Sequence, residues 1–350
     1  MDEAIKTAIA EMERARKPAD SVPWAPDAAH AQPIFGFDGA AETWGELPVG
    51  GRDPGPGPGP GPEPIDRLAL FSWNIDFMLP HARSRMEAGL AELEARVAAL
   101  PPRTAAVIFL QECVPDDLET VGRAAWVRRG FLRTDVDARH WATRAYGTTT
   151  LVDRRLSVKG VFRVHYALTR FDRDALFVDV AVSTGGGESE DGKGKEKVIR
   201  FCNTHLESLA QEPPYRPPQL ALAAKFMHDE AVHGALLAGD LNAIQPFDRT
   251  LHEANGLRDA YLELGGREDS DEGYTWGQQA PPQLRAQFGC SRMDKVLYCG
   301  GVAVESFARF GADVQVVDEG ERARILRWGG FEKPWITDHL GVFAEVVVVE

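Results

Sequence analysis

The stretch VIRFCNTHLES, residues 198–208, joins an apolar run to a histidine, a carboxylate and a hydroxyl group. The length and composition of the run predict a buried strand. His205, Glu207 and Ser208 follow at the point where this strand ends. Because single polar residues are common in the turns after strands, a functional interpretation depends on whether other strands end in the same way.

Apolar segments elsewhere in the chain also end beside acidic, amide or imidazole groups. The ends of neighbouring strands can meet at one rim, where this many carboxylates repel one another unless a cation offsets them. Oxygen ligands without thiolates favour magnesium or manganese over zinc. The motifs are SWNID (72–76), LQE (110–112), AGDLN (238–242), RMDK (292–295) and ITDHLG (336–341), with Asn74, Asp76, Glu112, Asp240, Asn242, Asp294, Asp338 and His339 as their polar residues.

The order of apolar runs predicts a mixed α/β fold. Strand-like runs at 67–73 and 105–112 flank a segment, 83–100, whose apolar residues recur at helical spacing. Many further strand-like runs follow, with a second helix expected over 217–232. We therefore expect a four-layer α/β sandwich, in which two packed mixed β-sheets are flanked by helices.

A Pro-Gly repeat at residues 51–64 predicts a domain boundary, because it offers few backbone donors and no apolar side chains to bury. We interpret residues 1–64 as a partly disordered N-terminal arm with a Pro/Gly-rich linker, and residues 65–350 as the catalytic domain. Aromatic residues at 33–47 are expected to dock on that domain. On this interpretation, deletion of the arm leaves hydrolysis of short substrates intact.

Composition restricts the class of protein. The formal net charge of −14 argues against a broad basic surface for nucleic acid or anionic membranes. The four scattered cysteines show no zinc-type spacing, which indicates reduced thiols in a cytosolic or nuclear protein. The N-terminal residues lack the apolar core of a secretory signal, and no run approaches transmembrane length.

The polar groups fit the hydrolysis of a phosphate ester. A metal ion can polarise the phosphoryl oxygen, an aspartate can orient or deprotonate water, and His205 and His339 can stabilise the developing negative charge. The sequence contains neither the GxSxG elbow of a serine hydrolase nor a Walker loop.

Taken in order, these motifs resemble those of the endonuclease/exonuclease/phosphatase superfamily. Within it the chain is most similar to the 5′-end-directed (type 2) tyrosyl-DNA phosphodiesterases, because HLES, YTWGQQ and SRMDKVLY occur there in similar form. The resemblance covers residue 65 to residue 350. It implies a magnesium-dependent phosphodiesterase, with manganese as a substitute, that hydrolyses 5′-phosphotyrosyl DNA adducts in the repair of trapped topoisomerase ends.

The resemblance also implies partners and a location. The expected partner is a DNA 5′ end that carries a covalent tyrosyl or peptide adduct, with no membrane involved. The protein is expected to be a monomer in the nucleus, and also in the cytoplasm.

The resemblance assigns a role to each catalytic residue. Glu112 and Asp76 would bind the metal, with Asn74 beside them. The remaining roles are attack and phosphate binding: Asp240 and Asn242 would position the attacking water, His205 and His339 would donate to phosphate oxygens, and Asp338 would orient His339.

The contacts to the DNA end carry over in the same way. Tyr146 and Arg173 correspond to residues that flank the active site. Ser208 corresponds to a phosphate contact, and Trp276 and Leu284 to an apolar wall under the terminal nucleotide.

The sequence departs from the family pattern at three positions and leaves alternatives open. Phe77 replaces a glycine, Ile244 an arginine and Leu340 a tryptophan. The loss of the arginine removes an anion contact and can change substrate preference. The alternatives are an abasic-site endonuclease, a deadenylase, a phosphatase, or an inactive scaffold that uses the fold for binding.

Overall fold

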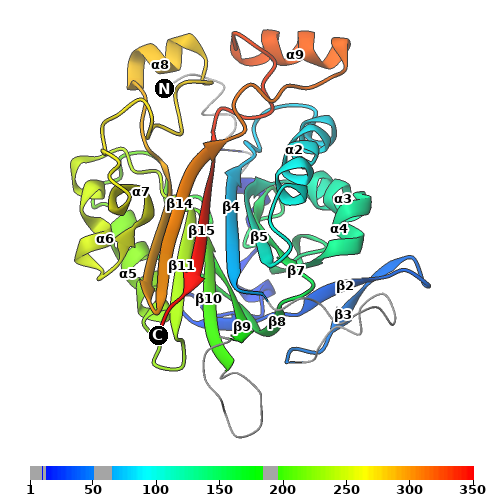
Figure 1. Ribbon diagram of the computed structural model, residues 1–350. Coiled ribbons are helices and arrows are strands. Elements are labelled where there is room, and N and C mark those ends of the chain that lie inside the picture. The colour runs from blue at the N-terminus through cyan, green and yellow to red at the C-terminus, as the bar shows by residue number, and fades with distance from the viewer. Residues whose placement is uncertain (1–9, 11–12, 51–64, 184–195) are drawn as a thin grey trace, which may run out of the picture.

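The computed structural model describes residue 10 and residues 13–50, 65–183 and 196–350. Over these residues the chain forms two β-sheets that pack face to face, with helices on both outer sides (Figure 1). The predicted four-layer α/β sandwich is confirmed. No helix in the described ranges combines the length and apolar composition that crossing a membrane requires.

The first sheet has eight strands and contains the runs at 67–73 and 105–112 as parallel neighbours at its centre. One edge of this sheet is formed by a short strand, Phe131–Arg133, followed in space by two strands from the N-terminal arm. In spatial order the strands are β14 (Val302–Phe310), β15 (Gly341–Val348), β4 (Arg67–Asn74), β5 (Thr104–Cys113), β7 (Gly147–Asp153), β6 (Phe131–Arg133), β2 (Ile34–Asp38) and β3 (Thr43–Leu47).

The second sheet has seven strands and contains the VIRFCNT run as its fourth strand. That strand pairs parallel with the next strand in the order and antiparallel with the previous one. In spatial order the strands are β1 (Ala29–Ala31), β8 (Ser157–His165), β9 (Asp174–Ser183), β10 (Glu196–Thr204), β11 (Gly234–Asp240), β13 (Asp294–Gly300) and β12 (Arg258–Asp259).

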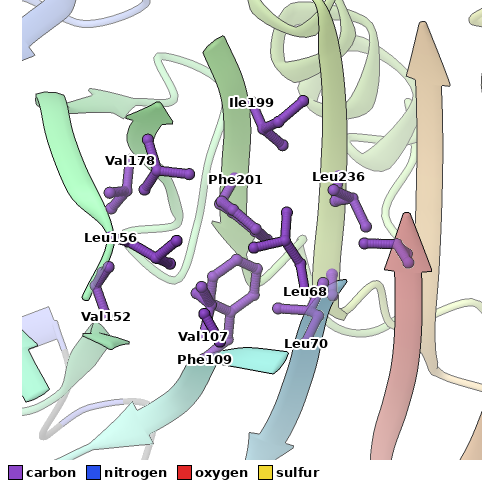
Figure 2. Packing of buried hydrophobic residues seen from close by; sticks show 14 of the residues in the cluster. Leu68, Leu70, Val107, Phe109, Val152, Leu156, Val178, Ile199, Phe201 and Leu236 are labelled. Atoms are coloured by element: carbon purple, nitrogen blue, oxygen red, sulfur yellow. The ribbon is translucent and has the colours of Figure 1, made fainter. Parts of the chain in front are cut away.

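The main core lies between the two sheets (Figure 2). Alternate residues of each strand face inward, because successive side chains of a strand point to opposite sides. Leu68 and Leu70 of β4 and Phe109 of β5 meet Phe201 of β10 and Leu236 of β11, and all five are at least 99% buried. This packing fixes the two sheets against each other and thereby holds their strand ends in place.

Helices cover the outer face of each sheet. On the eight-stranded sheet lie α2 (Ala82–Ala98), α3 (Pro115–Arg123) and α4 (Ala125–Gly130), and on the other lie α5 (Arg216–Met227), α6 (Leu251–Ala254) and α7 (Ala260–Glu263) (Figure 1). The last two, α8 (Pro282–Phe288) and α9 (Glu319–Gly329), lie beyond one end of the sheets. The predicted helices thus correspond to α2 and α5, each with its apolar side packed on a sheet.

The N-terminal arm takes part in both sheets. Strand β1 pairs with β8 in the seven-stranded sheet, whereas β2 and β3 extend the eight-stranded sheet through β6. Nearby, Lys17 Nζ donates to the carbonyl oxygens of Ala138 (2.6 Å) and Trp141 (2.7 Å). The Pro-Gly tract at 51–64 and residues 1–9 lie outside the described residues, so a boundary at residue 64 and partial disorder of the arm stay predictions.

Two histidines, the buried His165 and the partly buried His140, lie where the arm meets the main body, with their ring nitrogens shielded from solvent. Trp24 stacks on His165 with ring centroids 4.0 Å apart, and neither ring nitrogen of His165 or His140 has a hydrogen-bond partner among the described residues. Burial, with the charge of Arg163 added to it, lowers the pKa of His165 to about 3 and that of His140 to about 4. Both side chains are therefore neutral in the folded protein over the physiological range.

This arrangement predicts a loss of stability in mild acid. Below pH 6.5 the unfolded chain binds protons on both histidines while the folded chain does not, so the free energy of unfolding falls as the pH falls. For His165 alone the loss at pH 5 is about 2 kcal/mol. Urea denaturation at pH 5 and pH 7.5 measures it.

A pair of variants isolates the cause. His165→Gln should flatten the pH dependence, whereas the exposed His228, replaced by glutamine, should leave it as in the unaltered protein. If His165→Gln retains the full acid sensitivity, the buried histidine is not its source.

Candidate active site

The polar residues of the motifs meet at one rim of the sandwich. Strands β4 and β5 run parallel, as do β10 and β11, so each pair brings its carboxyl ends to one edge. Asp240 at the end of β11 lies opposite Asp294 at the start of β13. Strand β15 is antiparallel to β4, and it begins beside the end of β4, two residues after His339.

Asp240 lies at the centre of this rim. Its Oδ2 accepts a hydrogen bond from Asn74 Nδ2 (3.0 Å), and its Oδ1 accepts one from the backbone N–H of Asn242 (2.8 Å). The Nε2 atoms of His205 and His339 lie 3.3 and 3.7 Å from Oδ2. Burial alone raises the pKa of Asp240, but the two histidines and the Asn242 N–H outweigh burial and place it well below its usual value. Asp240 is therefore a carboxylate at neutral pH.

His339 is oriented by Asp294. Its Nδ1 lies 2.8 Å from Asp294 Oδ2, and both side chains are buried. Burial alone lowers the pKa of His339, but Asp294 and Asp240 raise it well above its usual value, so His339 is an imidazolium at neutral pH. Asp338 lies beside the other ring nitrogen, with its Oδ1 3.8 Å from His339 Nε2, and its Oδ2 accepts a hydrogen bond from Trp276 Nε1 (2.7 Å), so an orienting role for Asp338 stays a prediction.

A second group of carboxylates, Asp76, Glu112 and Asp338, lies close enough for their charges to act on one another. Burial, together with the charges of Asp338 and Glu112, raises the pKa of Asp76 to about 8. Asp76 and Glu112 both have φ of 58°, a left-handed conformation that costs energy in residues other than glycine. Glu112 Oε2 also accepts the N–H of Phe77 (3.1 Å), which places the loop after β4 beside β5. Hard oxygen ligands crowded in this way match the preference of Mg²⁺.

Among the described residues, Asp240, Asp294 and His339 form the one group of three carboxylate or imidazole side chains whose possible ligand atoms all lie within 4.8 Å of one another. Two of them already share the Nδ1···Oδ2 hydrogen bond, and His339 is protonated. Because a protonated imidazole cannot bind a metal ion, we favour Asp76 and Glu112 as the residues that would hold it.

The raised pKa of Asp76 predicts that metal binding releases a proton. At pH 7 this carboxyl group is protonated, so a divalent cation displaces close to one proton, and fewer at pH 9. Titration calorimetry with Mg²⁺ in two buffers of different ionisation enthalpy measures the number. The Glu112→Gln variant should bind Mg²⁺ more weakly. It should also release fewer protons, because one of the charges that raise the pKa of Asp76 is gone. A release of zero at pH 7 would contradict the assignment.

The predicted contacts to the DNA end fall into two groups. Arg173 and Tyr146 are buried: Arg173 bonds to His205 and Ser208, and the Tyr146 ring stacks on Phe77 with centroids 4.3 Å apart. In the second group Trp276 packs with Leu284, Ala280 and Met293.

Sequence reasoning missed the role of Asp294 and the polar link beneath the site. RMDK was recognised as a motif, but Asp294 received no role. Gln111 of β5 donates to Asn203 of β10 (2.8 Å) and to Ser72 of β4 (3.0 Å), which connects the sheets below the rim. The sequence does carry a signal for this link, because Gln111 and Asn203 are polar residues that interrupt buried apolar runs.

A comparison with protein-family models matches residues 71–339 to the "Endonuclease/Exonuclease/phosphatase family". The chain belongs to the endonuclease/exonuclease/phosphatase family. Members of the family are hydrolases that act on phosphoester bonds, and they typically depend on a divalent metal ion. No curated protein sequence matches the chain.

Solved structures of this family share the fold at low sequence identity. A humanized D. rerio TDP2 has 18% identity and a TM-score of 0.57, and the match covers 80% of this chain and 98% of that one. D. rerio TDP2 complexed with single strand DNA product has 17% identity, a TM-score of 0.57 and the same coverage. A Bacteroides thetaiotaomicron mannosyl-6-phosphatase has 16% identity and a TM-score of 0.54, with 80% and 99% covered. At these identities the likeness establishes the fold alone.

Proposed function

We propose that the chain is a magnesium-dependent phosphodiesterase that hydrolyses 5′-phosphotyrosyl DNA ends in the repair of trapped topoisomerase adducts. The observation that carries the proposal is the position of Trp276. Its indole donates to Asp338, its backbone pairs with His339, and Leu284 packs beside it. An aromatic and apolar group, with Trp276 itself 9% exposed, therefore lies against the catalytic rim, and we place the terminal nucleotide beside it.

The described residues supply the parts of a phosphoester hydrolysis. Asp240 and the Asn242 side chain would orient the attacking water, and the low pKa of Asp240 suits orientation better than proton abstraction. The His339 imidazolium and the His205 N–H would contact oxygens of the scissile phosphate, where negative charge develops. Magnesium held by Glu112 and Asp76 would withdraw charge from a phosphoryl oxygen.

The acidic chain suits recognition of an end rather than of long duplex. With a net charge of −14, nonspecific attraction to the phosphate backbone is weak, and a few contacts near the rim have to hold the substrate. We propose that the partner is a DNA 5′ end with a tyrosyl or peptide adduct, bound by a monomer in the nucleus.

One feature favours a second candidate function, a phosphatase that acts on a small phosphate ester. Ile244 stands two residues after Asn242, where the resembled enzymes have an arginine, and its side chain is 42% exposed. An apolar residue there offers no contact to an additional phosphate of a DNA strand. The Bacteroides thetaiotaomicron neighbour is itself named as a mannosyl-6-phosphatase.

A substrate panel distinguishes the candidates. The purified chain, with Mg²⁺ at fixed salt, is assayed on 5′-tyrosyl DNA, 3′-tyrosyl DNA, an internal abasic site, RNA and mannose 6-phosphate. The proposal predicts the highest kcat/KM for the 5′-tyrosyl single-stranded end. If the abasic site or the sugar phosphate is cleaved faster, the proposed 5′-phosphotyrosyl activity is wrong and the faster reaction is the activity of the chain.

Variants of Trp276 separate the wall from the chemistry. Trp276→Ala should lose activity on 5′-tyrosyl DNA selectively and keep hydrolysis of a small chromogenic phosphotyrosine analogue. Trp276→Phe is the matched control, because it keeps an aromatic face but loses the hydrogen bond to Asp338. Equal losses on both substrates in Trp276→Ala would show that Trp276 supports the catalytic centre and not the nucleotide.

A further inference from the structure

Arg173 lies directly before β9 and contacts two of the predicted phosphate-binding residues. Its Nη1 lies 2.7 Å from His205 Nδ1, and its Nη2 donates to Ser208 Oγ at 2.7 Å. Its side chain is 4% exposed, so the guanidinium lies behind these two groups and not on the surface. This differs from the direct role at the substrate that the resemblance implies for Arg173.

The chemistry of the guanidinium decides the hydrogen positions of its neighbours. Arginine stays protonated in proteins and offers only N–H donors. His205 Nδ1 and Ser208 Oγ must therefore each accept a hydrogen bond. A neutral His205 then carries its hydrogen on Nε2, and the hydroxyl hydrogen of Ser208 points away from Arg173.

The free side of His205 faces the reacting centre. Its Nε2 lies 3.3 Å from Asp240 Oδ2 and 3.7 Å from Glu112 Oε1, and it has no hydrogen-bond partner among the described residues. A buried donor without a partner is costly, and a phosphoryl oxygen between Asp240 and Glu112 would satisfy it. The side chain is only 2% exposed, so this donor is already directed inward before substrate binds.

Arg173 is itself held in place from several sides. The guanidinium lies 5.4 Å from the Tyr146 ring centroid and 5.7 Å from that of Phe171, and the Tyr146 hydroxyl donates to the Phe171 carbonyl oxygen. The loop before Arg173 is fixed by the buried Glu207, whose Oε2 accepts the Thr169 hydroxyl (2.8 Å). Tyr146 therefore supports the guanidinium.

The two histidines of the site are thus supported in opposite ways. His339 has the Asp294 carboxylate behind its Nδ1, whereas His205 has the Arg173 guanidinium there. A carboxylate accepts a hydrogen from Nδ1, and a guanidinium donates one to it. The same type of side chain therefore has a hydrogen-bond acceptor behind Nδ1 at one position and a donor behind it at the other.

We propose that Arg173 is a positioning residue that holds His205 as the Nε2–H tautomer and Ser208 with its hydroxyl hydrogen outward, so that both donate to one anionic phosphoryl group. The inference rests on the proposed function only in requiring a phosphoester substrate. It links the three predicted substrate contacts, because Tyr146 packs on the Arg173 guanidinium, which in turn donates to Ser208.

Nitrogen-15 NMR of histidine-labelled protein tests the tautomer directly, since protonated and unprotonated ring nitrogens differ strongly in chemical shift. The His205 signals are assigned by comparison with His205→Gln. In the unaltered chain, without substrate, we expect Nε2 protonated and Nδ1 unprotonated. A hydrogen on Nδ1 would overturn the proposal without any variant.

Variants add the link to catalysis. Arg173→Met should give a mixture of tautomers and a loss of kcat of about 10–100-fold on the chromogenic substrate, with a smaller change in KM. Lysine also offers only hydrogen-bond donors, so Arg173→Lys should restore part of the kcat and part of the Nε2–H tautomer population. Arg216→Lys is the matched control, because Arg216 is a buried arginine that bonds to the Glu207 and Leu209 carbonyl oxygens in the same loop without contacting His205.

The outcomes separate this inference from the proposed function. If Arg173→Met lowers kcat but leaves His205 as the pure Nε2–H tautomer, the role of Arg173 is structural and the inference fails. If the substrate panel shows no cleavage of 5′-tyrosyl DNA while the tautomer depends on Arg173, the inference stands and the proposed substrate is wrong. If Arg173→Met does not fold, the tautomer in the unaltered chain and in Arg173→Lys decides.

Discussion

Replacement of Asp240 by asparagine is expected to lower kcat by roughly 10²–10⁴-fold while leaving the fold intact. The carboxylate accepts hydrogen bonds from Asn74 and from the Asn242 backbone, and it raises the pKa of His339. An amide of the same shape keeps the volume but loses the charge. The water is then no longer oriented by an anion, and His339 loses one of the charges that keep it protonated.

The measurement is steady-state kinetics on the chromogenic phosphoester with saturating Mg²⁺, with thermal unfolding as the check on the fold. Asp229→Asn is the matched control, because its carboxylate is 46% exposed, pairs with Arg200 and contacts no residue of the site. Turnover by Asp240→Asn within a factor of about three of the unaltered chain would exclude Asp240 from the chemistry.

Deletion of residues 1–50 is expected to lower the free energy of unfolding by several kcal/mol, or to prevent folding. Ile34 and Phe35 of β2 are 1% and 3% exposed, and burial of two such side chains contributes about 3–6 kcal/mol. The deletion also removes the partners of β8 and β6 and exposes strand edges. This reverses the expectation from the Pro-Gly tract that the arm is dispensable.

Urea denaturation of the truncated and complete chains measures the effect. Point variants separate packing from edge exposure: Ile34→Ala should cost about 2–5 kcal/mol, whereas Val49→Ala, at a side chain that is 44% exposed, should cost less than about 0.5 kcal/mol. A truncated chain that unfolds at the same urea concentration as the complete chain would show that the arm adds no stability.

The sequence predicted the central strands because their apolar runs are long and continuous. Strands β4, β5, β10 and β11 lie where the runs indicated, and their ends bring the polar motifs to one rim. The arm was harder to interpret, since β1 to β3 have only three to five residues each and most of their exposed face is polar. Short edge strands carry little periodicity, and tertiary contacts decide their conformation.

The partner of His339 could not be obtained from sequence order. Asp338 is its neighbour in the chain, but it lies beside Nε2 of the ring, at 3.8 Å, and bonds to Trp276. Asp294 of another strand is the residue that reaches Nδ1 of His339. The same limit applies to Arg173, whose contact with His205 depends on how the loop before β9 folds back.

The position of β15 in the eight-stranded sheet has a consequence for synthesis on the ribosome. Residues 67–72 of β4 take one of their two neighbours from residues 342–347 of β15. When β4 and β5 leave the exit tunnel, that side of β4 stays without a partner until almost the whole of the described chain has been translated. Exposed apolar strands of this kind associate with other chains and with chaperones. We therefore expect nascent chains that stop before residue 341 to remain bound to chaperones, and chains that include β15 to fold slowly, because the central pairing joins distant segments.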